Sequence, residues 1–303
     1  NLITNRSGGS VCVLTQTNEE AVVLVALLKK YGLNAKLIQS MDGFRFWNMV
    51  EVRYFMKLVE KATYTPLISD YVWENAKQKT FSSYASSSSL CYLQRCIQIF
   101  EEINKAKYLT DFKEFIFESS VEDFCDFGTA DVVVSTIHKS KGMEFDDVYM
   151  FISETRNITD EVLRRYYVGI TRAKQRLFIH TNSLFFKTFK ASQMTIDRTV
   201  YEMPDEVALQ LSHKDGNLGY FKSRKKEILS LKAGQQLHFD NNYLYDVAST
   251  KPICQLSQKQ KDELRLWNEK GYNVSSASIR FIVAWRPKDL PKEEGEYAVV
   301  LAD

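Results

Sequence analysis

The chain has 303 residues, of which 45% are hydrophobic and 26% charged, a composition typical of a folded globular protein with two or more domains. Its 40 Lys and Arg residues against 38 Asp and Glu leave a net charge of +2, which excludes polyanion binding through the field of the whole molecule. The five cysteines lack C-x-x-C spacing, which argues against a disulfide framework and against a zinc site.

No apolar run approaches the roughly 18 residues that a membrane span requires. The start at Asn1 shows neither an initiator Met nor a signal-peptide pattern. We therefore expect a piece of a longer cytoplasmic protein, with no membrane partner and no metal bound by its own residues.

The first sixty residues are predicted to alternate between strands and helices, which indicates a parallel α/β unit. Thr17 or Asn18 is expected to cap the first helix. The elements are expected at 10–15 (strand), 20–31 (helix), 34–39 (strand) and 44–60 (helix). We assign residues 1–60 to the first part of a RecA-like domain of the P-loop NTPase type.

Three further segments follow. Residues 61–130 are aromatic-rich and helical, clearest at 90–100 and 112–117, and are predicted to form a short insertion. Residues 131–190 resume the parallel sheet, with strands at 131–138, 148–153 and 176–181. Thr159 or Asp160 is expected to cap a helix that runs to about Ala173. Residues 191–303 are predicted to be a small β-rich domain, with strands at 207–211, 236–239, 279–285 and 297–301 and a helix at 259–270.

The run Asp131-Val-Val-Val-Ser-Thr-Ile-His138 reads as a buried strand that delivers polar groups to the edge of a sheet. Thr136 and His138 would share one face of this strand and, with Lys139 beside them, could form a phosphate-binding platform. Glu144, two residues past Gly142, could pair with Lys139 or Lys141 or accept a hydrogen bond from a ribose hydroxyl.

Arg172 lies in Tyr166-Tyr-Val-Gly-Ile-Thr-Arg-Ala-Lys174, at the end of an otherwise apolar helix. A charged guanidinium in such a place needs a partner. It could neutralise the charge on a transferring γ-phosphoryl group, as an arginine finger does, or form a structural ion pair with a nearby carboxylate.

Together these two stretches resemble motifs V and VI of the UvrD/PcrA/Rep group of superfamily 1 DNA helicases. T-x-H-x-x-K-G-x-E-F and Y-V-x-x-T-R-A-K are both intact here, and residues 11–60 are similar to motif IV and the helices after it. One position departs from the family, because Thr15-Gln16 stands where motif IV usually has Tyr-Arg.

The resemblance implies the C-terminal portion of an ATP-dependent DNA helicase or translocase. It implies that Arg172 is the arginine finger, that Gly142, Glu144 and Gln16 approach the nucleotide, and that Thr136, His138 and Lys139 contact single-stranded DNA. The implied partners are single-stranded DNA, duplex junctions and an N-terminal helicase domain of the same polypeptide, and the implied processes are DNA repair and recombination.

No G-x-x-x-x-G-K-[S/T] loop occurs in the chain, and no hydrophobic strand ends in an Asp-Glu pair suited to magnesium. ATP and Mg²⁺ would therefore be bound mainly by the N-terminal domain, and we expect this fragment alone to hydrolyse no ATP. The alternative is a catalytically inactive, helicase-derived adaptor for nucleic acid or protein, which the Thr15-Gln16 departure favours slightly.

The last hundred residues contain a basic run, Phe221-Lys-Ser-Arg-Lys-Lys226, together with the aromatic residues Tyr243, Tyr245, Trp267 and Trp285. Cations and rings can bind nucleic acid by phosphate pairing and base stacking. The same pattern is also typical of a solvated face over a small β core.

Overall fold

The computed structural model describes residues 9–38, 41, 43–125, 130–153, 158–286 and 296–303. Residue contacts divide the chain into two compact units, each built from two separate stretches. Unit 1 contains residues 1–39 and 126–208, and unit 2 contains residues 40–125 and 209–303. The expected division at 1–60, 61–130, 131–190 and 191–303 stays a prediction.

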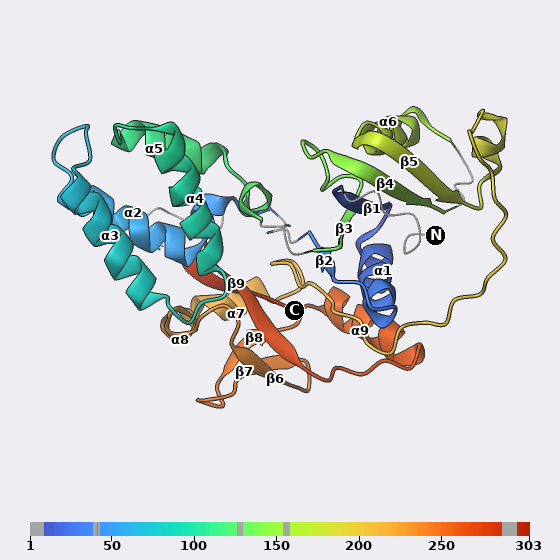
Figure 1. Cartoon of the computed structure of the whole chain (residues 1–303). Coiled ribbons are helices and arrows are strands. Elements are labelled where there is room, and N and C mark those ends of the chain that lie inside the picture. Colours follow the sequence, from blue (N-terminus) through green and yellow to red (C-terminus); the bar gives the residue numbers. More distant parts are fainter. Residues whose placement is uncertain (1–8, 39–40, 42, 126–129, 154–157, 287–295) are drawn as a thin grey trace. The chain divides into compact units, whose positions relative to one another are not determined.

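Unit 1 is a parallel sheet of five strands in the order β2-β3-β1-β4-β5 (Figure 1). Its buried strands are rich in β-branched residues, as expected when both faces of a parallel sheet are covered. The strands are β1 (Val11–Thr15), β2 (Ala35–Leu37), β3 (Val132–Thr136), β4 (Phe145–Ile152) and β5 (Ala173–Thr181). The second strand is shorter than expected, and residue 39 lies outside the described part.

One α-helix packs on each face of this sheet, and the short helix η3 (Leu184–Thr188) adds Phe185 and Phe186 to the core on the α6 side. Along β1, Val11 and Val13 share a core with α1 (Asn18–Lys30), whereas Cys12 and Leu14 share a core with α6 (Asp160–Ile170). A capping box starts α1, because the Thr17 hydroxyl accepts from the amide of Glu20 and the Glu20 carboxylate accepts from the amide of Thr17. Of the two residues predicted to cap α6, Thr159 is the cap, and its hydroxyl accepts from the amide of Val162.

Unit 2 combines helices from residues 40–125 with an antiparallel sheet in the order β10-β9-β6-β7-β8. The predicted helix at 44–60 is broken, because Met49 adopts an extended conformation (φ −60°, ψ 135°) and bridges to Val283. The helices are η1 (Phe46–Asn48), α2 (Val50–Ala62), α3 (Asp70–Ser83), α4 (Leu90–Ile103), α5 (Leu109–Glu118), η2 (Val121–Phe124), α7 (Leu218–Lys222), α8 (Lys225–Ser230) and α9 (Gln258–Glu269).

The strands of unit 2 are β6 (Gln236–Asp240), β7 (Tyr243–Asp246), β8 (Pro252–Gln255), β9 (Ala277–Trp285) and β10 (Tyr297–Ala302). The predicted strand at 207–211 is wrong. This segment is held without strand pairing: the buried guanidinium of Arg280 donates to the carbonyl of Leu211 (2.9 Å) and to the side chain of Gln210 (3.2 Å), and it forms an ion pair with Asp303 (2.9 Å).

The predicted fold class is confirmed: the chain is an α/β protein with a RecA-like parallel sheet and a β-rich C-terminal part. Within unit 2, the helices at 40–125 and the strands at 236–302 contribute to one continuous hydrophobic core. Among the described residues, no helix combines the length and the apolar character needed to cross a bilayer.

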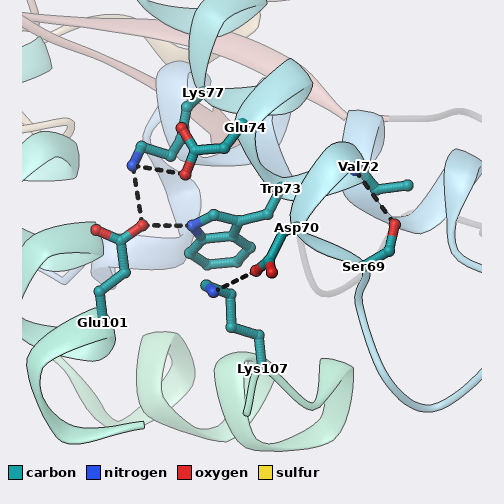
Figure 2. Close-up of polar contacts among 8 residues, drawn as sticks. All are labelled: Ser69, Asp70, Val72, Trp73, Glu74, Lys77, Glu101 and Lys107. Carbon is teal, nitrogen blue, oxygen red and sulfur yellow. Dashed lines mark hydrogen bonds and ion pairs between the residues drawn. The ribbon is translucent and has the colours of Figure 1, made fainter. Parts of the chain in front are cut away.

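Trp73 lies at the centre of the helical part of unit 2 and is fully buried. Its ring meets those of Phe55 and Phe112 edge-on, at centroid distances of 5.2 and 4.8 Å. Figure 2 shows the polar side of the same residue, where the indole Nε1 donates to Glu101 (2.6 Å), which also accepts from Lys77 (2.9 Å). The buried ring is therefore anchored by both packing and a charge-assisted hydrogen bond.

We predict that Trp73→Ala lowers the free energy of unfolding by about 3–5 kcal/mol, because a large aromatic side chain is removed from a packed core. Urea denaturation followed by circular dichroism measures the change. Tyr71→Ala on the same helix is the matched control, since that ring is 78% exposed and its loss should cost at most about 0.5 kcal/mol. Equal effects of the two substitutions would contradict the prediction.

Candidate functional site

Strand β3 ends at Thr136, and a tight turn follows at once. The amide of Ser140 donates to the carbonyl of Thr136 (3.2 Å), and the amide of Lys139 donates to the Thr136 hydroxyl (3.3 Å). Thr136 is buried, whereas His138 is exposed on the turn. The two side chains therefore do not share a strand face as the sequence suggested. The threonine stabilises the turn that directs the imidazole outward.

The loop from this turn to β4 crosses the sheet from the carboxyl end of β3 to the start of β4. Gly142 adopts φ +88°, in the left-handed region that favours glycine, although space for a Cβ is open there. Glu144 is exposed and pairs with Lys174 at 3.7 Å. The structure thus pairs Glu144 with Lys174, a different lysine from Lys139 and Lys141, which the sequence suggested.

Arg172 follows the C-terminal end of α6 and is half-buried. Its Nε donates to the carbonyl of Val168 (2.9 Å), its Nη1 to the carbonyl of Met143 (2.9 Å) and its Nη2 to the hydroxyl of Thr171 (3.0 Å). Two of these acceptors are backbone carbonyls, one of them near the C-terminal end of α6, where helix carbonyls lack intrahelical partners.

Within the described part of the chain, Arg172 forms no ion pair with a carboxylate. The structural ion pair considered for this residue is therefore replaced by hydrogen bonds to neutral acceptors. Three of the five N–H groups of the guanidinium are engaged in this way. These hydrogen bonds fix the orientation of the guanidinium, and the neutral acceptors do not neutralise its positive charge.

Gln16 follows β1 and is half-buried. Its amide donates to Glu20 (2.9 Å), and its side-chain Nε2 lies 3.4 Å from the hydroxyl of Tyr166. The strand pairings place it at the carboxyl end of the sheet, where Thr15 pairs with Thr136.

The strand pairings divide the predicted site residues between two edges of the sheet. Gln16, Thr136 and the turn with His138 and Lys139 lie at the carboxyl ends of β1 and β3. Gly142, Glu144 and Arg172 lie at the opposite edge, where β4 and β5 begin with the paired residues Phe145 and Ala173. Gly142, Glu144 and Arg172 thus share an edge, and the structure does not bring Gln16 to it.

Sequence reasoning missed a row of side-chain pairs between β4 and the edge strand β5. Asp147, buried in the sheet, forms a two-pronged ion pair with Arg176 (2.8 and 2.5 Å). The next pairs on this face are stacked rings, Tyr149 on Phe178 (4.4 Å) and then Phe151 on His180 (4.7 Å). The alternation of polar or aromatic residues with aliphatic ones along both strands was the available signal.

Clusters of three or more His, Cys, Asp or Glu side chains able to hold a metal ion are absent from the residues that the structure describes. Burial raises the pKa of the Cys12 thiol far above its usual range, and Cys12 is a free cysteine inside the sheet. It is a core residue of unit 1 and has no place in the site.

Comparison with known proteins agrees with the resemblance read from the motifs. Residues 62–183 match the family model of the UvrD-like helicase C-terminal domain. The matched segment contains the turn at Thr136, the loop with Gly142 and Glu144, and Arg172. This part of the chain is a UvrD-like helicase C-terminal region, as predicted.

Individual relatives are DNA helicases by name. The chain is 26% identical over 206 residues to the ATP-dependent DNA helicase PcrA of Bacillus subtilis, covering 60% of this chain and 27% of that protein. It is 37% identical over 87 residues to the ATP-dependent DNA helicase Rep of Buchnera aphidicola, covering 24% and 13%. It is 26% identical over 160 residues to the probable DNA helicase II homolog of Rickettsia felis, covering 48% and 23%. The chain thus spans about a quarter or less of the length of these relatives.

We predict that unit 1 loses stability as the pH falls from 7 towards 5, because burial lowers the pKa of His180 below its usual 6.5, with Asp197 opposing the shift. Below pH 6.5 the unfolded state binds a proton that the folded state resists, so the free energy of unfolding decreases until the folded pKa is passed. Urea denaturation across this range measures the slope.

His180→Phe keeps a ring against Phe151 and should flatten this part of the pH dependence. The effect should persist in 0.5 M salt, because burial and not a neighbouring charge is its largest cause. A slope that is the same in the native chain and in the variant would contradict this interpretation of His180.

Proposed function

We propose that this chain is the C-terminal portion of an ATP-dependent DNA helicase or translocase, in which it supplies the arginine finger and part of the single-stranded DNA track. The observation that carries the proposal is the guanidinium of Arg172, which is held by two backbone carbonyls and a hydroxyl and pairs with no carboxylate among the described residues. A positive charge that is oriented in advance stabilises a developing negative charge without reorganisation at the moment of reaction.

In this proposal ATP and Mg²⁺ are bound mainly by an N-terminal helicase domain of the same polypeptide. Arg172 then meets the γ-phosphoryl group and offsets the charge that it gains during transfer. Gly142 and Glu144 lie beside Arg172 at the same edge of the sheet. The glycine allows close approach of the backbone to a phosphate. The carboxylate of Glu144 can accept a hydrogen bond from a ribose hydroxyl, which would replace its ion pair with Lys174.

Gln16 has less support as a nucleotide ligand. It is a neutral amide at the opposite edge of the sheet, with its Nε2 directed at Tyr166. This arrangement is the observation that favours the second candidate function, a catalytically inactive adaptor for nucleic acid or protein. The two candidates differ in whether the charge of Arg172 is used in hydrolysis.

For the DNA track, the support is the exposed imidazole of His138 on a turn that Thr136 stabilises through its hydroxyl and carbonyl. Lys139 is half-buried on the same turn. Rigid turns that present polar groups suit interactions with the phosphate backbone, which position a nucleic acid without reading its sequence. The two helicase domains would close around bound ATP and separate after hydrolysis. The contact between this turn and the DNA strand would then form and break in each cycle, which would move the protein along the strand.

We expect the complete protein to act at duplex junctions, in DNA repair and recombination, in the cytoplasm. We further propose that residues 1–60 and 131–190 are the RecA-like parts, that 61–130 is an insertion and that 191–303 is an accessory domain.

The arginine-finger role is tested in a polypeptide that contains both this chain and the N-terminal helicase domain that binds ATP. We expect Arg172→Ala to lower the DNA-stimulated rate of ATP hydrolysis by about a thousandfold, the usual effect of losing an arginine finger. The affinity for single-stranded DNA should stay within about twofold. Arg164→Ala, at an exposed position on α6, is the matched control.

Thermal unfolding of both variants separates a catalytic loss from a folding defect. This chain alone should hydrolyse no ATP. Hydrolysis by the pure chain that depends on Arg172, or full activity of the joined polypeptide carrying Arg172→Ala, would rule out the finger role and leave the adaptor.

The DNA track is tested by fluorescence anisotropy with a labelled single-stranded oligonucleotide. His138→Ala should weaken binding by about tenfold, the effect of losing a hydrogen bond to a charged group. Lys139→Ala should reduce the slope of log affinity against log salt by about 0.7, the value for one phosphate pairing on a single strand. Lys29→Ala, at an exposed position in the last turn of α1, should change neither quantity. If neither His138→Ala nor Lys139→Ala changed the affinity or its salt dependence, the turn would not be part of the DNA-binding track.

A further inference from the structure

A continuous row of aromatic rings crosses one face of unit 2 and ends at an arginine. The ring of His238 lies 6.2 Å from that of Tyr245, which lies 6.2 Å from that of Tyr243, which in turn lies 6.0 Å from that of Tyr220. The guanidinium of Arg224 lies 5.6 Å from the centre of the Tyr220 ring. His238 is exposed, and the other four side chains of the row are half-exposed.

The hairpin of β6 and β7 produces this row. Its two-residue turn, Asn241-Asn242, has positive φ at both positions (47° and 68°), which fixes the pairing of the strands. Because side chains alternate between the faces of a strand, Leu237 and Leu244 enter the core while His238 and Tyr245 point the other way.

Hydrogen bonds hold two of the rings in place. The hydroxyl of Tyr220 donates to the carbonyl of Pro252 (3.3 Å), and the side chain of Gln255 donates to the hydroxyl of Tyr243 (2.9 Å). The polar ends of both rings are thus fixed to β8. Rings held in this way lose little further freedom when a planar ligand stacks on them.

Basic residues gather at the arginine end of the row, on α7, on α8 and between them. Exposed or half-exposed cations there are Lys222, Arg224, Lys225 and Lys226. The Nε of Arg224 is buried and lacks a hydrogen-bond partner among the described residues.

The acidic residues near the row have partners or lie at its far end. Glu227 pairs with Lys251 at 4.0 Å, and the Asp246 carboxylate accepts from Ser249 and from the amide of Ala248 within its own turn. Asp240 is exposed beside the hairpin turn. The arginine end of the row is therefore positive on balance, and this local charge is not visible in the net charge of the chain.

We infer that this face, named here the ring row and consisting of His238, Tyr245, Tyr243, Tyr220 and Arg224, is a binding site for single-stranded nucleic acid. Rings accept unpaired bases by stacking whatever the base is, and the neighbouring cations pair with phosphates. A duplex hides the faces of its bases, so the rings favour a single strand. Trp267, suggested by the sequence, is buried under Tyr272 and does not take part.

The ring row goes beyond the proposed function, because it belongs to unit 2 and the proposed DNA track at His138 belongs to unit 1. The two sites can succeed or fail separately. If only the track binds DNA, binding should not depend on the aromatic rings of the ring row. If only the ring row binds DNA, binding should not depend on the turn at Thr136.

The test uses the 303-residue chain and a fluorescein-labelled dT oligonucleotide, with affinity measured by fluorescence anisotropy at several salt concentrations. Tyr245→Ala should lower the affinity by at least about fivefold, the lower end of the effect of removing one base stack. Tyr245→Phe keeps the ring and should restore the affinity. Tyr71→Ala, which removes an exposed ring on α3, is the control and should have no effect.

Charge is tested separately with the double variant Lys225→Glu, Lys226→Glu, which should reduce the salt slope by about 0.7 for each phosphate that the variant no longer neutralises. Lys79→Glu on α3 is its exposed control. A 2-aminopurine base in the oligonucleotide should lose fluorescence on binding to the native chain and much less with Tyr245→Ala.

The site would be overturned if Tyr245→Ala and the double lysine variant, both shown by circular dichroism to be folded, bound the oligonucleotide as tightly as the native chain. Equal affinity for a blunt duplex of the same length would overturn its preference for single strands. The 2-aminopurine signal distinguishes this inference from the DNA track, because the loss of fluorescence should persist in His138→Ala and be reduced only in Tyr245→Ala.

Discussion

An arginine held by neutral acceptors organises one edge of the parallel sheet in unit 1. Had a carboxylate satisfied Arg172, the pair would have been a local structural feature with little charge to offer a ligand. Instead the carbonyls of Val168 and Met143 orient the guanidinium and leave its charge in place. The same hydrogen bonds join the end of α6 to the loop that carries Gly142 and Glu144, so one side chain both organises this edge of the sheet and charges it.

The other edge of the sheet follows a different principle. There a buried threonine hydroxyl and carbonyl fix a turn, and an exposed imidazole is the group presented to solvent. One edge is thus built around an oriented positive charge and the other around a turn with polar groups. In the proposed function, the first edge meets the nucleotide and the second meets the nucleic acid strand.

Much of the fold could be predicted from sequence because periodicity and caps are local. The β-branched run before Thr136, the capping box at Thr17 and the cap at Thr159 all report structure within a few residues. The break at Met49 could not be predicted, because it depends on a bridge to Val283 more than two hundred residues away. The strand expected at 207–211 failed for a similar reason, since Arg280 satisfies that segment from β9.

For the candidate site, the sequence suggested which residues take part but not which of them lie together at one edge of the sheet. The motifs named Arg172, Glu144 and Thr136 by residue type and spacing. They did not reveal that the strand would stop at Thr136, that Arg172 would bind carbonyls, or that Gln16 would lie at the other edge. These properties depend on strand pairing between distant segments, for which a single sequence carries little signal.

Each unit is completed only by chain that comes after the other unit has begun. Unit 1 needs residues 126–208 to complete a sheet that starts with β1, and unit 2 needs residues 209–303 to cover the core of its helices. During synthesis, the apolar faces of α2 to α5 that pack on the strands of unit 2 therefore stay uncovered until those strands are made, more than a hundred residues later. A fragment cut to the boundaries of the family match, 62–183, would divide both cores, so biochemical dissection of this protein should follow the units and not the motifs.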